Sequence, residues 1–182
     1  KKLNNEDYYL PFATSLRMSD LGYQNSVRSN FSVSTNSLND YISDLKKATE
    51  TVSKDFREIE QKELLQLNNN ILQIDDEYYA IARPKSKNLS DQRLTKKLKG
   101  SGVDYIEIRS LDLNPFTESG IDQETLYFLD IFLIYCFLKP SEHISNSELE
   151  EIRSNDSLVA KKGREPKLLL RCNKKNISLE DW

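Results

Sequence analysis

Two segments of the chain carry the spacing and the end signals of α-helices. In residues 38–59 the apolar positions lie three and four apart, and Ser37 precedes them as a candidate N-cap. Residues 147–162 follow Ser145, another candidate cap, and Gly163 stands where a helix would end. The pattern therefore predicts an amphipathic helix over 38–59 and a further helix over 147–162.

A third helical segment, residues 123–138, is apolar on nearly every face and follows Asp122 as its candidate cap. A membrane-spanning helix needs about 20 apolar residues. This segment is shorter, carries Asp130 and stops before Pro140. We therefore interpret it as a helix buried in the core of the protein.

Short apolar runs predict strands over 71–74, 78–82 and 167–171, and alternation with a period of two predicts a strand over 103–111. The first two flank the acidic turn 75–77, and Pro84 is expected to end the second because it cannot donate to a strand ladder. In the strand over 103–111, Glu107 and Arg109 fall on the same face. The middle of the chain is therefore expected to form antiparallel hairpins.

Composition excludes several classes of protein. With 37% hydrophobic residues, nine tyrosines and seven phenylalanines, wholesale disorder is excluded. The 26 basic and 29 acidic residues give a net charge of −3, which provides no overall attraction to nucleic acid or an acidic membrane. Two cysteines cannot build a disulfide scaffold and fit a reducing compartment. The chain opens without Met, so its 182 residues can be a piece of a longer protein.

Several common catalytic patterns are missing from the sequence. It has neither a Walker-type phosphate loop nor a Gly-x-Gly-x-x-Gly fingerprint. Cys136 and Cys172 are too isolated for a zinc knuckle. The one histidine, His143, follows a predicted helix in a loop, where a solvated role is favoured over that of a catalytic base.

Arg17 and Tyr23 form the first candidate site, because a guanidinium fork and a phenol in a polar loop can bind a small carboxylate. The simpler alternative is a surface ion pair between Arg17 and Asp20. The second candidate is the segment 75–85, in which three carboxylates precede Arg83 and Lys85. Here the pattern favours a hairpin with ordinary solvated charges.

Glu107 and Arg109 form the third candidate, since they are two residues apart on one strand face. They can pair as a salt bridge, or Glu107 can bind a divalent cation while Arg109 holds a phosphate. The fourth candidate is the basic run 83–99. It is best interpreted as a mobile, solvated loop, with coverage of a nucleotide phosphate as the alternative. Nucleic-acid binding is disfavoured, because residues 84–99 contain no aromatic residue for stacking.

Three motifs, taken together and in order, resemble bacterial-type glutamate–cysteine ligase (γ-glutamylcysteine synthetase). They are residues 9–23 (YLPFATSLRMSDLGY), 70–85 (NILQIDDEYYAIARPK) and 105–116 (YIEIRSLDLNPF). Members of this family are much longer, and most of their acidic metal ligands precede the first motif. The resemblance therefore implies a central-to-C-terminal piece that lacks the N-terminal part of the same protein.

The resemblance implies an α+β fold, with a partial curved antiparallel sheet flanked by helices as in glutamine synthetase. Residues 1–182 would form one region of the ligase catalytic domain. The implied reaction joins the γ-carboxyl of L-glutamate to the amine of L-cysteine through a γ-glutamyl phosphate, as the first step of glutathione biosynthesis. It implies Mg²⁺ or Mn²⁺ as cofactor, ATP as co-substrate and a cytoplasmic location, with neither nucleic acid nor membrane as partner.

The resemblance also implies roles for individual residues. It implies cysteine binding by Arg17, Tyr23 and Tyr79, metal binding by Glu107, and contact with the transferred phosphate by Arg109. Nucleotide contact by Arg83 and Lys85 is inferred more from their charge and position than from the family pattern. One metal-ligand carboxylate cannot hold the cations that phosphoryl transfer needs, so we expect this chain alone to be inactive. The alternative is a non-catalytic binding or regulatory module that retains the ligase fold.

Overall fold

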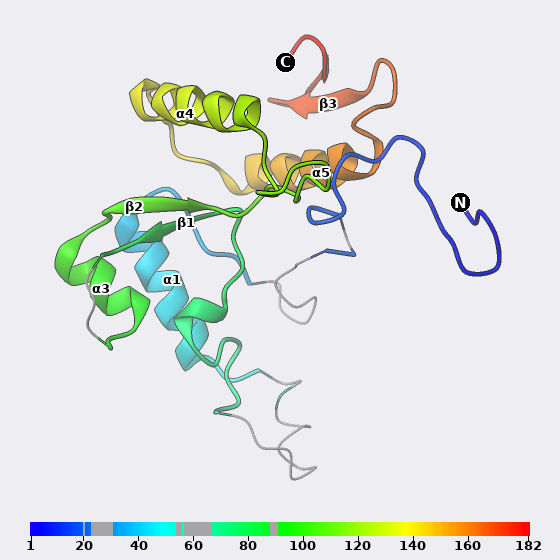
Figure 1. The fold of residues 1–182 in the computed structure, drawn as a ribbon. Coiled ribbons are helices and arrows are strands. Elements are labelled where there is room, and N and C mark those ends of the chain that lie inside the picture. The colour runs from blue at the N-terminus through cyan, green and yellow to red at the C-terminus, as the bar shows by residue number, and fades with distance from the viewer. Residues whose placement is uncertain (20, 23–30, 54–55, 57–66, 88–90) are drawn as a thin grey trace. The chain divides into compact units, whose positions relative to one another are not determined.

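The computed structural model describes residues 1–19, 21–22, 31–53, 56, 67–87 and 91–182 (Figure 1). These residues divide into two compact units. One unit comprises Lys1–Gly22 and Leu111–Trp182, and the other comprises Tyr23–Ser110. The Tyr23–Ser110 unit contains most of the candidate site residues.

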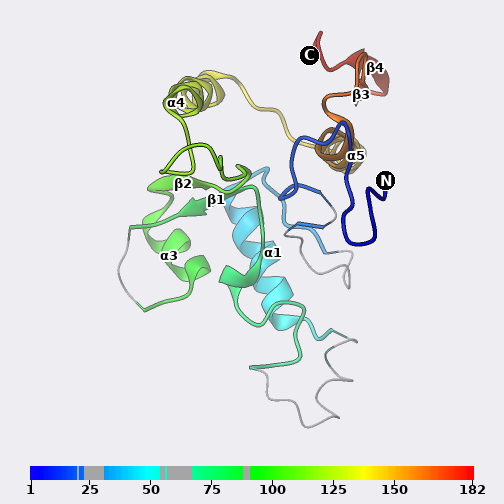
Figure 2. The ribbon, with the colours of Figure 1, turned by 45° about the vertical axis from the view of Figure 1, so that its right-hand side comes forward.

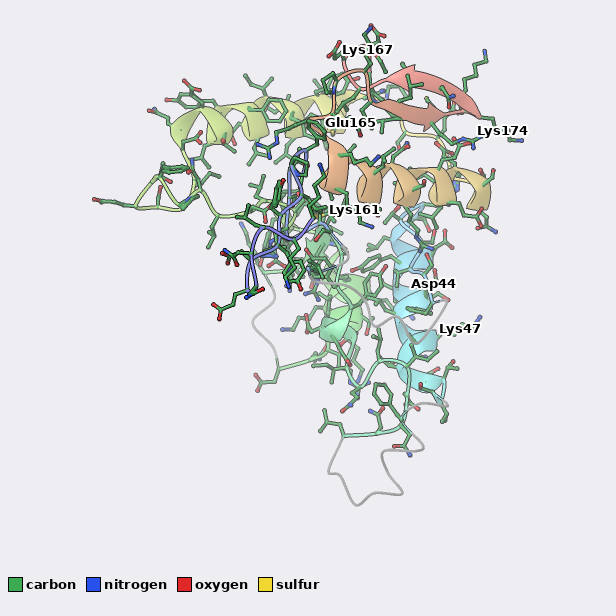
Figure 3. The ribbon with its side chains drawn as sticks, turned by 90° about the vertical axis from the view of Figure 1, so that its right-hand side faces the viewer. Asp44, Lys47, Lys161, Glu165, Lys167 and Lys174 are labelled. Atoms are coloured by element: carbon green, nitrogen blue, oxygen red, sulfur yellow. The ribbon has the colours of Figure 1, made fainter. Side chains whose placement is uncertain are left out.

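The first helix of this unit, α1, spans Leu38–Glu50. Ser37 caps it as predicted, because its hydroxyl oxygen accepts a hydrogen bond from the Asp40 N–H at 3.0 Å. Asp44, labelled in Figure 3, accepts a bond from the Ser34 N–H at 2.9 Å and ties the preceding segment to the helix.

The predicted end of this helix at residue 59 is wrong, because α1 ends at Glu50. The backbone beyond it bonds to residues 69–71 instead: the Ile71 N–H donates to the Thr51 carbonyl, and the Ser53 N–H donates to the Asn69 carbonyl, each at 2.8 Å. Peptide groups used in this pairing cannot also continue the helical ladder. Residues 54–55 and 57–59 of the predicted helix lie outside the described residues.

The acidic segment forms a 3₁₀-helix, η1 (Asp75–Glu77), and residues 71–74 form no strand. Asp75 is 2% exposed and accepts two bonds from Thr95, at 2.8 Å from its N–H and 2.7 Å from its hydroxyl. Thr95 lies in the first turn of α3 (Leu94–Ser101), so Asp75 caps that helix from a distant segment. The interpretation of 75–77 as ordinary solvated charges is therefore wrong for Asp75.

Strands β1 (Ala82–Lys85) and β2 (Tyr105–Ile108) pair in antiparallel fashion, with Arg83 opposite Glu107 and Pro84 opposite Ile106. The prediction that Pro84 ends the strand is wrong. The Arg109 N–H donates to the carbonyl of Ile81, just before β1, at 2.8 Å, so Ile81, Arg83 and Lys85 direct their peptide groups toward β2. Pro84 lies between these residues, and its backbone nitrogen points away from β2, so its missing N–H costs the pair no hydrogen bond.

The core of this unit lies where α1 packs against α3 and η1. Among its described residues, Leu45 of α1 and Leu98 of α3 are the largest fully buried side chains, and the core also includes Tyr41, Ala48, Leu72 and Leu94. The interpretation of 83–99 as a mobile loop is wrong at both ends, because residues 83–85 lie in β1 and Leu94 and Leu98 of α3 pack in the core.

The other unit contains α4 (Gln123–Leu138), α5 (Asn146–Lys162) and the antiparallel hairpin of β3 (Leu169–Cys172) and β4 (Lys175–Ser178). Figure 2 shows the hairpin beside α5. The side-chain amide of Asn155 bonds both backbone groups of Arg171, accepting from its N–H at 3.0 Å and donating to its carbonyl at 2.7 Å. At the hairpin turn, where Figure 3 labels Lys174, the backbone N–H of Lys174 donates to the Glu151 carboxylate at 3.1 Å.

The caps of both helices confirm the sequence predictions. Asp122 accepts from the Thr125 N–H at 2.7 Å, and Ser145 accepts from the Glu148 N–H at 3.3 Å. The bond from Thr125 is the main reason that the pKa of Asp122 lies below its usual value. These local signals fix where α4 and α5 begin.

The prediction that 123–138 is a buried core helix is wrong for this structure, since no residue of α4 is buried. Large apolar side chains are exposed along the helix, and Phe137 reaches 88%. No other described helix or strand of its unit packs against it. Among the described residues, no helix combines the length and hydropathy needed to cross a membrane.

Candidate active site

The candidate site is built on one face of the β1–β2 pair. Arg83 and Glu107 are directly opposite each other in the register, and Lys85 lies on the same side of β1 as Arg83. The turn of η1 brings Asp76 to this group, because the chain passes from η1 into β1 within a few residues. Four charged side chains from three elements are thereby gathered on one sheet face.

A continuous series of ion pairs joins these four side chains. The Asp76 carboxylate oxygen Oδ1 lies 3.1 Å from Arg83 Nη2 and 3.5 Å from Lys85 Nζ. Lys85 Nζ in turn lies 3.7 Å from Glu107 Oε2. Lys85 is therefore shared between two carboxylates, and Asp76 is shared between two cations.

Glu107 has one carboxylate oxygen suited to a divalent cation. Its Oε2 atom is buried and accepts no hydrogen bond from the described residues, although Lys85 lies nearby. A carboxylate oxygen is a hard ligand of the kind that Mg²⁺ and Mn²⁺ prefer. Within the described residues, however, no cluster of three or more metal-ligating side chains occurs. Glu107 thus fits as one ligand of an incomplete set.

Arg109 and Tyr79 form a second contact at the end of the same pair of strands. The Arg109 guanidinium carbon lies 5.1 Å from the centre of the Tyr79 ring, in a cation–π arrangement. The Tyr79 hydroxyl donates to the Arg109 carbonyl at 3.3 Å. The ring therefore orients a cationic side chain two residues beyond Glu107, where it can meet an anion.

Arg83 is placed differently from the expectation that it contacts a nucleotide. Its side chain is buried (4% of the residue is exposed) and donates to both the carbonyl and the carboxylate of Asp76, each at 3.1 Å. Burial raises the pKa of the neighbouring Tyr41, an effect that the charge of Arg83 opposes, so the phenol stays neutral. These contacts favour a structural role, and the nucleotide role of Arg83 remains a prediction, as does that of the more accessible Lys85.

Arg17 belongs to the other unit, and Tyr23 lies outside the described residues. The backbone N–H of Arg17 donates to the Asp112 carboxylate at 3.0 Å, and the Ser15 hydroxyl accepts from the Met18 N–H at 3.0 Å. These bonds hold the loop that carries Arg17. Of the predicted site residues, the structure places Arg83, Lys85 and Glu107 on the β1–β2 pair, and Tyr79 and Arg109 in contact at its end.

The sequence interpretation missed the role of Asp76 in the site. The available signal was the acidic run followed by Arg83 and Lys85, which share one face of a strand. Pairing between them depends on the η1 turn, which the sequence pattern did not reveal.

Comparison with known proteins places the chain in a family. The family described as glutamate–cysteine ligase matches residues 1–159. Glutamate–cysteine ligase of Aliivibrio fischeri is 43% identical over 96% of this chain, and that of Pseudomonas putida is 43% identical over all of it. The chain covers 34% and 35% of these two proteins, so it spans about a third of their length.

Solved structures show the same likeness. Glutamate–cysteine ligase from Francisella tularensis, in complex with AMP, matches 94% of this chain and 35% of its own with a TM-score of 0.85 at 34% identity. A bifunctional glutathione synthetase from Pasteurella multocida shares the fold at a TM-score of 0.59 and 24% identity, over 81% of this chain and 16% of its own. The predicted α+β ligase fold is confirmed. The chain belongs to the glutamate–cysteine ligase family.

Proposed function

We propose that this chain is part of an ATP-dependent glutamate–cysteine ligase and contributes one wall of its active site. The observation that carries the proposal is the position of Glu107 and Arg109 on β2 and just after it, with a buried Glu107 oxygen that accepts no hydrogen bond from the described residues. The AMP complex of the Francisella tularensis relative supports a nucleotide as co-substrate.

The proposed reaction has two steps. A γ-carboxylate oxygen of glutamate attacks the terminal phosphorus of ATP, and ADP leaves with the electron pair of the broken P–O bond. The cysteine amine then attacks the acyl carbon, the C–N bond forms, phosphate leaves and the amine loses a proton. The product is γ-glutamylcysteine, the first intermediate of glutathione biosynthesis.

The residues of this chain would act on charge and on substrate position. Arg109 would stabilise the charge on the transferred phosphoryl group, with its orientation supported by Tyr79. Glu107 would hold Mg²⁺ or Mn²⁺, which neutralises charge on the phosphate oxygens when bound. Tyr79, together with Arg17 and Tyr23, would bind cysteine, and Lys85 would contact the nucleotide.

The described residues supply only part of the chemistry. Glu107 is a single carboxylate ligand, whereas phosphoryl transfer needs cations held by several ligands. We therefore propose that an N-terminal part of the same protein supplies the remaining ligands, and that the 182-residue chain alone is inactive. A cytoplasmic location completes the proposal, in keeping with Cys136 and Cys172 as free thiols.

The phosphorylated intermediate can be tested in a chimera, in which this chain replaces the matching third of the Aliivibrio fischeri ligase. With glutamate, cysteine, ATP and Mg²⁺, we expect γ-glutamylcysteine, ADP and inorganic phosphate in equal amounts, measured by chromatography and a phosphate assay. The same chimera without cysteine measures the background hydrolysis of ATP. Release of AMP and pyrophosphate would point to an acyl adenylate and overturn the γ-glutamyl phosphate step.

A further inference from the structure

Lys85 occupies a position between two carboxylates, and that position has a consequence for Glu107. Its ammonium nitrogen lies 3.5 Å from Asp76 Oδ1 and 3.7 Å from Glu107 Oε2. Both distances are longer than the about 2.7–2.9 Å of a strong charge-assisted hydrogen bond, so neither carboxylate binds the ammonium tightly. The Glu107 oxygen nearest to this cation is the same buried atom that accepts no hydrogen bond from the described residues.

Asp76 is itself held firmly. Arg83 Nη2 donates to its carbonyl and to its carboxylate, each at 3.1 Å, and the Arg83 side chain is only 5% exposed. Asp76 is also the central residue of η1, a turn that the Glu77 N–H closes by donating to the Ile74 carbonyl at 3.2 Å. Asp76 is therefore a fixed negative charge, whereas Lys85 has a long flexible stem that can move between its two partners.

We infer that Asp76 is a positioning residue for the Glu107 cation site and acts through Lys85. By attracting the ammonium group, Asp76 keeps Lys85 from pairing fully with Glu107, and so leaves the Glu107 oxygen open to a divalent cation. A lysine ammonium and a metal ion compete for the same oxygen, so the position of Lys85 controls the affinity of the site. This inference rests on the proposed function, because it takes Glu107 to be a metal ligand.

Three variants of the chimera test this inference by Mn²⁺ binding, which electron paramagnetic resonance measures without turnover. Asp76→Asn keeps an oxygen for Arg83 but loses the charge that attracts Lys85, so Mn²⁺ should bind about tenfold more weakly. Lys85→Met removes the competing cation, so Mn²⁺ should bind about threefold more tightly or better. In the double variant, Asp76→Asn should have no further effect, because the residue through which it acts is gone.

Matched controls come from neighbours outside this series of ion pairs. Glu77→Gln removes a charge from the same 3₁₀-helix, where its carboxylate accepts from the Gln73 N–H at 2.7 Å and the amide oxygen can still do so. Lys87→Met removes a neighbouring lysine. Both should leave Mn²⁺ affinity within about twofold. Urea unfolding of each variant shows whether the fold is retained, and Lys85→Met, which predicts a gain, cannot be mimicked by loss of structure.

The outcomes separate the inference from the proposed function. If the unchanged chimera binds Mn²⁺ and makes product, but Asp76→Asn weakens binding equally with and without Lys85, then Asp76 acts directly and the inference is overturned. If Lys85→Met weakens Mn²⁺ binding, the competition is also refuted. If the unchanged, folded chimera neither binds Mn²⁺ nor makes product, the proposed function itself fails, and the inference fails with it.

Discussion

Replacing Glu107 by Gln in the chimera is expected to lower ligase turnover by at least a factor of about 10²–10³. The amide keeps the size and the strand position of the side chain but removes the negative charge that a divalent cation requires. Glu107 is the one carboxylate of β1 and β2, so no other residue of these two strands can take over the role. The measurement is the steady-state rate of γ-glutamylcysteine formation at saturating ATP.

Glu118→Gln is the matched control for this experiment, because Glu118 is exposed and lies outside the β1–β2 pair. Its rate should stay within about twofold of the unchanged chimera, as expected for a surface substitution. Circular dichroism of both variants shows that the fold is retained. If Glu107→Gln keeps more than half of the turnover, Glu107 is not a ligand of the catalytic cation.

Replacing Leu45 by Ala is expected to destabilise the Tyr23–Ser110 unit by about 2–5 kcal/mol. Leu45 is 0% exposed and lies on α1 among the side chains that join it to α3 and Leu72. Removing its branched end leaves a cavity that this core cannot readily fill. Small domains are stable by only about 5–15 kcal/mol, so the loss is a large fraction of the stability of the unit.

Hydrogen exchange within Leu38–Glu50 and Leu94–Ser101 measures this effect where it occurs. Protection in both helices should fall together, because they share one core. Leu21→Ala provides the control, since Leu21 is 82% exposed and belongs to the other unit. A loss of less than about 1 kcal/mol in Leu45→Ala would show that Leu45 does not anchor this core.

The features that could be predicted from the sequence are local. Ser37, Asp122 and Ser145 cap their helices as expected, because each N-cap needs only a side chain and an N–H three residues away. Strand β2 is also a local feature, because the alternating residues around Glu107 predict it from the sequence. Such signals involve few residues that are close in sequence.

The features that could not be predicted depend on distant partners. Helix α1 ends at Glu50 because residues 51–53 pair with 69–71. Strand β1 includes Pro84 because the backbone nitrogen at that position points away from β2 and would form no hydrogen bond with it. The apolar pattern of α4 indicates a helix that avoids water on every side, but the pattern does not say which residues would cover it.

The candidate site divides in the same way. Strand alternation predicts that Glu107 and Arg109 lie on the same face. The contact of Tyr79 with Arg109 depends instead on how the chain returns after η1. The pairing of Asp76 with Lys85 also depends on that turn. Roles for Arg17 and Tyr23 came from the family resemblance and remain proposals.

The central claim is that this chain forms part of a ligase active site and needs the rest of the protein to complete it. The most direct measurement compares γ-glutamylcysteine formation by the 182-residue chain alone and by the chimera, with glutamate, cysteine, ATP and Mg²⁺, by mass spectrometry. We predict product from the chimera and none above background from the chain alone. Robust turnover by the chain alone would contradict the claim, and so would a folded chimera that makes no product.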